Sequence, residues 1–266
     1  MDAAEPLVSL SDYSYSALFF SEFVGTAVLI LIGVGVSANV SLSKSLGYRG
    51  GWLLACFGWA FGVFTGASIA WRSGGQLNPA VSIAQSLTDS EAQGWDLTGL
   101  FIVAQVLGAL TGALLAYLAY KKQFDTHDEP ENTGGAFFTA PTVRAPAWNV
   151  VSEAIATFVL VFFVIESSPL EVGVGDGLFD DSKSALGYAA TAFVILAIAS
   201  GLGGPTGYAI NPARDLGPRI FYAIAPIKGK GSADWGYAWV PIVGPILGAF
   251  AAFGLFTLGQ SFGVTT

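Results

Sequence analysis

Long apolar runs alternate with short polar segments along this chain of 266 residues. A helix needs about 20 mostly apolar residues to cross the ~30 Å hydrocarbon core of a bilayer. Six runs approach that length, and they predict membrane-spanning helices at 16–38, 50–71, 98–120, 148–167, 185–203 and 238–260. The pattern therefore predicts an all-α membrane protein, and we expect residues 1–266 to form one domain.

Two shorter apolar segments between these runs each carry the tripeptide Asn-Pro-Ala. Asn is a favoured N-cap and Pro is favoured at the first helical position, so each tripeptide predicts the start of a helix. A helix of about ten residues covers roughly 15 Å, which is half of the hydrocarbon core. We therefore expect two re-entrant half-helices that meet inside the membrane and complete the wall of a pore, one opened by Asn78, Pro79 and Ala80 and the other by Asn211, Pro212 and Ala213.

The two halves of the chain repeat one order of elements. The segment 21–29 resembles 152–160, and Asn78 follows Glu22 by 56 residues while Asn211 follows Glu153 by 58. Each half contains three spans, so the second half enters the membrane from the opposite face. This is an inverted repeat, covering roughly 16–120 and 148–260. The polar stretch between the halves, 123–147, is expected to be a loop outside the membrane.

Two acidic residues, Glu22 and Glu153, lie inside predicted spans, where a carboxylate is costly and usually functional. We expect each to accept backbone N–H bonds from the neighbouring Asn-Pro-Ala loop and so to anchor it. A proton relay is the alternative interpretation. Because a relay needs further ionisable partners and the spans offer few, the anchoring role is preferred.

Composition agrees with membrane insertion, since 53% of the residues are apolar and 11% are charged. The net charge of −8 gives no support for nucleic-acid binding. The single cysteine, Cys56, cannot form an intramolecular disulfide. The first fifteen residues contain no Lys or Arg, so we expect no cleavable signal peptide. The sequence shows no nucleophile motif, phosphate-binding loop or metal-ligand cluster, so no enzyme activity, metal or cofactor is predicted.

The basic residues bear on orientation. Six spans place both termini on one side of the membrane. Only Arg72 and Lys183 fall on that side, whereas seven basic residues fall on the other: Lys44, Arg49, Lys121, Lys122, Arg144, Lys228 and Lys230. Because cytoplasmic loops usually carry the excess of Lys and Arg, this count places the termini outside.

Paired Asn-Pro-Ala boxes in inverted repeats resemble the major intrinsic protein family, also called the aquaporin family, over nearly the whole chain. The resemblance implies a right-handed bundle of six transmembrane helices and two re-entrant half-helices. It also implies cytoplasmic termini, against the basic-residue count, and a homotetramer with one pore in each subunit.

The segment 207–219 is most similar to the glycerol-facilitator branch of that family, in particular to its members from Gram-positive bacteria. Three positions mark the branch. Asp215 stands where water channels usually have Ser, and Arg219 stands where they favour a small residue. Pro241 lies in a pair of positions, before Val-Gly-Pro, where they carry aromatic residues.

The resemblance also implies a narrow ring near the outer mouth, formed by Trp59, Tyr208 and Arg214. The alignment of Trp59 requires a one-residue deletion before the first box; the alternative is that it is an ordinary aromatic residue of a span. Backbone carbonyls before the boxes are expected to face the pore, at Gly74, Gly75, Gln76, Gly207, Tyr208 and Ala209. The only histidine, His127, lies in the polar joining loop, so the ring lacks the His typical of water channels.

This resemblance implies a passive channel for glycerol and other small uncharged solutes that also passes water and excludes protons and ions. Dihydroxyacetone, urea and undissociated lactic acid are further candidate solutes. A water-selective aquaporin is the alternative within the family. A proton-coupled secondary transporter is the alternative from another class, since such proteins also contain inverted repeats and broken helices.

Overall fold

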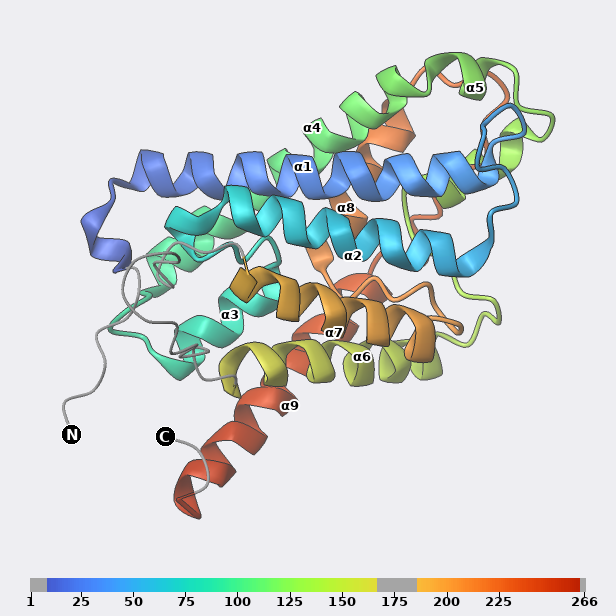
Figure 1. Cartoon of the computed structure of the whole chain (residues 1–266). Coiled ribbons are helices and arrows are strands. Elements are labelled where there is room, and N and C mark those ends of the chain that lie inside the picture. Colours follow the sequence, from blue (N-terminus) through green and yellow to red (C-terminus); the bar gives the residue numbers. More distant parts are fainter. Residues whose placement is uncertain (1–8, 167–185, 264–266) are drawn as a thin grey trace.

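The computed structural model describes residues 9–166 and 186–263. The described residues form an all-helical bundle (Figure 1). Its six long helices are α1 (Tyr15–Ser41), α2 (Gly51–Ile69), α4 (Trp95–Ala119), α6 (Pro146–Glu166), α7 (Leu186–Leu202) and α9 (Val240–Ser261). The shorter helices are α3 (Pro79–Thr88), α5 (Lys121–Asp125), α8 (Pro212–Ile224) and the 3-10 turns η1 (Leu10–Asp12), η2 (Trp71–Ser73) and η3 (Pro130–Ala136).

The six long helices coincide with the six apolar runs. Five of them, α1, α2, α4, α6 and α9, are long and apolar enough to cross a bilayer. The sixth, α7, is an apolar helix of 17 residues. The predicted end of the fourth span at residue 167, the predicted start of the fifth at 185, and Lys183 lie outside the described residues.

Helix packing repeats the internal symmetry of the sequence. In the first half α1 packs on α2 and α4, and in the second half α6 packs on α7 and α9. Contacts between the halves are also paired, since α2 packs on α7, α4 packs on α8 and α3 packs on α9. The two repeats therefore form one bundle around a shared interior.

Glycines allow the closest of these contacts. A Cβ atom added at Gly108 or Gly112 of α4 would lie 2.4 or 2.3 Å from a backbone oxygen of α1. A Cβ atom at Gly248 of α9 would lie 2.4 Å from the Ala154 carbonyl oxygen of α6, and one at Gly244 would lie 2.5 Å from the Glu153 Cβ atom. Glycines four residues apart are a common means of close helix packing in membranes, and here both halves use it.

The two half-helices, α3 and α8, begin in the interior at the Asn-Pro-Ala boxes. Asn78 caps α3 by accepting the Ala80 N–H, and Asn211 caps α8 by accepting the N–H groups of Ala213 and Arg214. In both helices Pro occupies the first helical position, as the sequence pattern predicts. Figure 1 shows the two helices running from the middle of the bundle in opposite directions. Their N-terminal ends therefore meet inside the protein.

Candidate functional site

The described residues enclose a cavity of about 220 Å³ between the two halves of the chain. Its wall is formed by residues of α1, α2, α3, α6, α7 and α8 and by the loops that precede the two boxes. Apolar side chains of the wall include Val63, Leu160 and Ile195. Polar groups come from the boxes and from Gln85, Tyr188 and Thr191. A mixed wall of this kind suits a small solute that has both carbon and hydroxyl surfaces.

Asn78 and Asn211 link the two half-helices across the cavity. The Asn78 side-chain N–H donates to the Ile210 carbonyl at 2.9 Å, and the Asn211 side-chain N–H donates to the Leu77 carbonyl at 2.8 Å. Their side-chain oxygens are occupied as helix caps. Because a carboxamide carries two N–H donors, each Asn can hold the opposite loop and still present a second donor to the cavity it lines.

Glu22 of α1 is fully buried behind the first box. Its carboxylate accepts the backbone N–H groups of Gln76 and Leu77, at 3.0 and 2.8 Å. It also accepts the Ser73 hydroxyl at 2.6 Å and the Gln105 amide at 2.7 Å. These four donors compensate the loss of water around the carboxylate and fix the loop before Asn78.

Glu153 of α6 occupies the equivalent place behind the second box, with 1% of its surface exposed. It accepts the backbone N–H groups of Ala209 and Ile210, at 2.9 and 2.8 Å, and a hydrogen bond from the Thr206 side chain. Each carboxylate thus binds two successive N–H groups of the loop that precedes its own box.

Both loops have backbone conformations that side chains rarely adopt. Positive φ angles occur at Leu77 (54°), Tyr208 (41°) and Ile210 (45°), where a residue with a Cβ atom is strained by about 1–3 kcal/mol. Each of these residues either donates its N–H to a buried Glu or directly precedes one that does. Of the six residues expected to present carbonyls, Gly74, Gly75, Gln76, Tyr208 and Ala209 line the cavity and Gly207 does not.

Trp59, Tyr208 and Arg214 come from three elements and line the same cavity. The Arg214 guanidinium lies over the Trp59 ring, 3.8 Å from its centroid, and donates to the Phe137 carbonyl at 3.4 Å. All three side chains are more than 90% buried. A cation stacked on one aromatic ring, with a second ring in the same wall, gives this part of the cavity apolar aromatic faces beside the hydrogen-bond donors of Arg214.

The position of Trp59 is set by its neighbours on α1. Its indole N–H donates to the Ser37 hydroxyl at 3.0 Å, and a Cβ atom at Gly33 would lie 2.3 Å from the ring. Trp59 therefore faces the interior next to Arg214 rather than the outer surface of α2.

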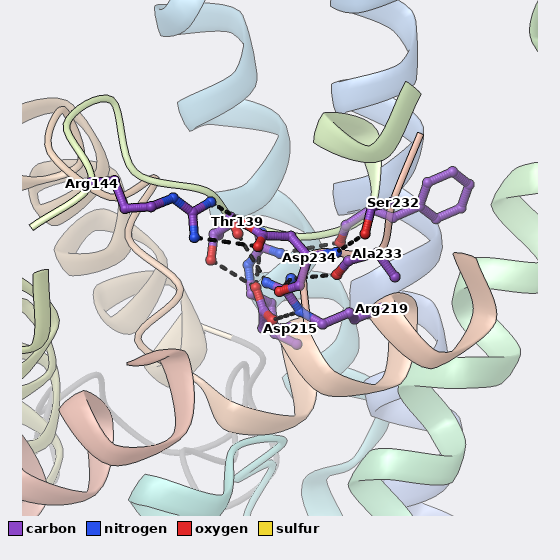
Figure 2. Close-up of polar contacts among 9 residues, drawn as sticks. Thr139, Arg144, Asp215, Arg219, Ser232, Ala233 and Asp234 are labelled. Atoms are coloured by element: carbon purple, nitrogen blue, oxygen red, sulfur yellow. Dashed lines mark hydrogen bonds and ion pairs between the residues drawn. The ribbon is translucent and has the colours of Figure 1, made fainter. Parts of the chain in front are cut away.

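The three branch-marking residues do not line the cavity. Pro241 is buried in the first turn of α9. Asp215 and Arg219 pair across one turn of α8, with the Arg219 Nε–H donating to the Asp215 carboxylate at 2.7 Å (Figure 2). Both side chains are buried, which makes this pair different from the exposed ion pair of Arg144 and Asp234 in the same view.

The Asp215–Arg219 pair ties three segments together. Asp215 accepts the N–H and the hydroxyl of Thr139, at 2.8 and 2.7 Å. Arg219 donates to the carbonyls of Thr139, Ala233 and Asp234, at 2.9, 2.7 and 3.0 Å. Thr139 lies two residues after Phe137, whose carbonyl accepts a hydrogen bond from Arg214. The ion pair therefore holds the segment that contacts Arg214.

A sequence model of the family described as "Major intrinsic protein" matches residues 9–256 of this chain. The chain belongs to the major intrinsic protein family. Its helices and its family make it a multi-pass membrane protein.

Relatives within the family agree with the branch expected from the sequence. The glycerol uptake facilitator protein of Bacillus subtilis is 44% identical, over 86% of this chain and 80% of that protein. The probable glycerol uptake facilitator protein of Thermotoga maritima is 40% identical, over 90% and 98% of the two chains. Among solved structures, the aquaglyceroporin from Plasmodium falciparum matches with a TM-score of 0.78 and 28% identity, covering 94% and 99%. The resemblance to the glycerol-facilitator branch, with a Gram-positive member among its relatives, is confirmed.

Several residues that support the site in this family member were not expected from the sequence. Ser73, Gln105 and Thr206 complete the shells of the two buried Glu residues, and Thr139 receives the Asp215–Arg219 pair. Each contact joins segments that are separated in sequence and have no shared local pattern. The small polar residues Ser73 and Thr206, each shortly before a box, were the only local signal.

Proposed function

We propose that this chain is a passive transmembrane channel for glycerol and other small uncharged solutes, which also conducts water and excludes protons and ions. The observation that carries the proposal is the ring of Trp59, Tyr208 and Arg214 on one buried cavity. Relatives that are named glycerol uptake facilitators support it.

The ring suits the two surfaces of a polyol. The carbon backbone packs against the apolar faces of Trp59 and Tyr208, while the hydroxyl groups receive hydrogen bonds from Arg214. Backbone carbonyls of the loops before the boxes accept hydrogen bonds from the same hydroxyls. An uncharged solute can exchange its hydration shell for these hydrogen bonds at a small cost in free energy, whereas an ion cannot.

Proton and cation exclusion follows from the centre of the cavity. The N-terminal ends of α3 and α8 carry partial positive charge and converge at Asn78 and Asn211. Together with Arg214 they form an electrostatic barrier of the kind that aquaporin-type pores use. The contacts along the path are weak and successive, as conduction requires.

Glu22 and Glu153 are proposed as loop anchors in this channel. Their oxygens hold backbone N–H groups and neighbouring polar side chains, and a proton accepted there would break those bonds. This arrangement favours the anchoring role over a proton relay, and so favours a passive channel over a proton-coupled transporter.

The proposed ring combines Arg214 with two aromatic residues, Trp59 and Tyr208. It lacks the His that water-selective channels carry there, and this difference favours solutes larger than water. Glycerol is the leading solute, with dihydroxyacetone, urea and undissociated lactic acid as further members of the proposed range.

We further propose that residues 1–266 act as one channel domain, that the termini are cytoplasmic, and that the chain forms a homotetramer in the lipid bilayer.

Equilibration of labelled glycerol into proteoliposomes tests the passive mechanism. Without any ion gradient, internal glycerol should rise to the external concentration faster than in empty liposomes. An imposed proton gradient should change neither the rate nor the final level. Accumulation above the external concentration would contradict a passive channel.

A further inference from the structure

Gln76, in the loop before the first box, is held at its side chain as well as at its backbone. Its backbone N–H donates to Glu22 at 3.0 Å. Its side-chain N–H donates to the side-chain oxygen of Gln93, and the Gln93 amide nitrogen lies 3.4 Å from the Gln76 side-chain oxygen. Gln76 lines the cavity, whereas Gln93 does not. The pair therefore binds the end of a cavity-lining side chain to a residue behind the wall.

Gln93 is itself fixed, in the connection between α3 and α4. Its residue is 3% exposed, and its backbone N–H donates to the Asp89 carbonyl at 3.0 Å. Its amide nitrogen donates to the Ser82 carbonyl of α3 at 3.1 Å and to the Thr98 hydroxyl of α4 at 3.0 Å. A side chain bound to two helices is a rigid partner for Gln76.

These contacts determine which end of the Gln93 amide meets Gln76. The Ser82 carbonyl can only accept a hydrogen bond, so the Gln93 nitrogen must face it. The Gln93 oxygen is then left for Gln76, and an oxygen acceptor requires the Gln76 nitrogen. A backbone carbonyl of α3 thus sets the orientation of both amides.

The second box does not repeat this arrangement. Ala209 stands two residues before Asn211, as Gln76 stands two residues before Asn78, and a methyl group makes no hydrogen bond. The first loop alone therefore places a long polar side chain at this point of the cavity wall. A Gln side chain has several rotatable bonds, so an amide without a partner samples many positions, including positions inside the cavity.

We propose that Gln93 is a positioning residue that keeps the Gln76 amide out of the solute path and so leaves the cavity open to solutes larger than water. The inference rests on the proposed glycerol-channel function for its effect on selectivity. The contact between the two amides is independent of that function and can be measured separately.

Permeability measurements on a double-mutant cycle test the effect on selectivity. In Gln93→Ala the released Gln76 amide enters the cavity and obstructs glycerol more than water, because glycerol is larger. The glycerol-to-water permeability ratio should fall roughly fivefold, the size expected for one hydrogen bond. Gln76→Ala removes the amide but keeps the backbone groups, so adding Gln93→Ala to it should not lower the ratio further. An equal fall in both backgrounds would overturn the positioning role.

Three further variants separate positioning from packing. Gln93→Glu still accepts the Gln76 N–H but loses the donors to Ser82 and Thr98, so it should keep the ratio and unfold at a lower temperature. Thr98→Val removes another partner of Gln93, leaves the Gln76 contact, and should also keep the ratio. Glu91→Ala, at an exposed position of the same connection, should change neither quantity. If Thr98→Val lowers the ratio as far as Gln93→Ala does, the effect comes from packing and the proposal is overturned.

Thermal unfolding in detergent tests the contact without reference to transport. Gln76→Ala should lower the unfolding temperature of the unaltered chain by about 2–4 °C and should have no effect in the Gln93→Ala background. Gln93→Met, which keeps the side-chain volume, serves as the background if Gln93→Ala does not fold. Equal shifts in the two backgrounds would overturn the proposal even if glycerol flux is normal. Unequal shifts in a protein that does not conduct glycerol would support the contact and contradict the proposed function instead.

Discussion

At the scale of single residues, the site depends on buried polar groups that hold the backbone in strained conformations. Glu22 and Glu153 each bind two successive N–H groups of a loop that contains positive φ angles. Such conformations persist only where the surroundings determine them, and a carboxylate with several donors provides that constraint.

Replacing Glu153 by Gln tests this constraint. The amide keeps one acceptor oxygen but turns an N–H donor toward a backbone N–H, which should lower stability by about 1–3 kcal/mol. Thermal unfolding in detergent should occur at a lower temperature, glycerol flux should fall, and the pH dependence of flux should not change. Glu131→Gln, at an exposed position, should alter none of these quantities. Loss of a pH dependence in Glu153→Gln would revive the proton-relay interpretation.

The ring offers a second test at this scale. Tyr208→His combined with Trp59→Phe reduces the apolar surface and adds polar donors, so glycerol permeability should fall more than water permeability. Stopped-flow measurements on the same vesicle preparation give both rates. An unchanged ratio of the two rates would mean that these residues do not form the selective ring.

The residue scale also shows what a sequence can predict about this site. Asn78 and Asn211 were found because N-cap and Pro preferences act within a few residues. The residues Ser73, Gln105 and Thr139 were not, because their partners are fixed only when distant helices pack. Trp59 lies between these cases: its place beside Arg214 depends on the packing of α1 against α2, which no local pattern specifies.

At the scale of elements, a buried ion pair of α8 binds two other segments of the chain, at Thr139 and at Ala233 and Asp234. Arg219 donates to Asp215 and to three backbone carbonyls from two other segments, and its guanidinium lies 4.2 Å from the centroid of the Phe138 ring. Lys230 contributes at the end of α8, where it donates to the carbonyls of Tyr222, Ala223 and Ala225. The half-helix is therefore held at both ends.

Arg219→Lys tests the ion pair as a device that positions the segment next to Arg214. A lysine keeps the charge but cannot form the forked set of hydrogen bonds, so glycerol flux per folded protein should fall severalfold. Arg144→Lys is the matched control, because the Arg144–Asp234 pair is exposed and contributes little. Equal glycerol flux in the two variants would show that the buried ion pair is not needed for conduction.

Helix packing gives another test at the element scale. In Gly248→Val of α9 the new side chain would meet the Ala154 carbonyl of α6, and overpacking of this kind costs about 1–3 kcal/mol or more. The yield of folded protein should drop. Gly254→Val lies on the same helix with no atom within 4 Å of the added Cβ, and its yield should match the unchanged chain. A normal yield for Gly248→Val would show that α6 and α9 can separate without loss.

At the scale of the whole molecule, the inverted repeat explains the architecture more fully than any single motif. Each half of the chain contains one helix pair, α1–α4 or α6–α9, with glycines between its two helices. Each half also contains one buried Glu. The sequence predicted the six helices and the two half-helices because apolar length and capping signals are local. Orientation was not settled by local signals, since the basic-residue count and the family resemblance disagree.

Stopped-flow light scattering of proteoliposomes measures whether the cavity conducts glycerol passively. Vesicles that contain the protein are compared with empty vesicles, first under an osmotic gradient of an impermeant solute and then under a gradient of glycerol. We expect fast water movement and, in glycerol, fast reswelling that needs no ion gradient. Fast water movement without glycerol entry would contradict passive glycerol conduction and place the protein among the water-selective channels.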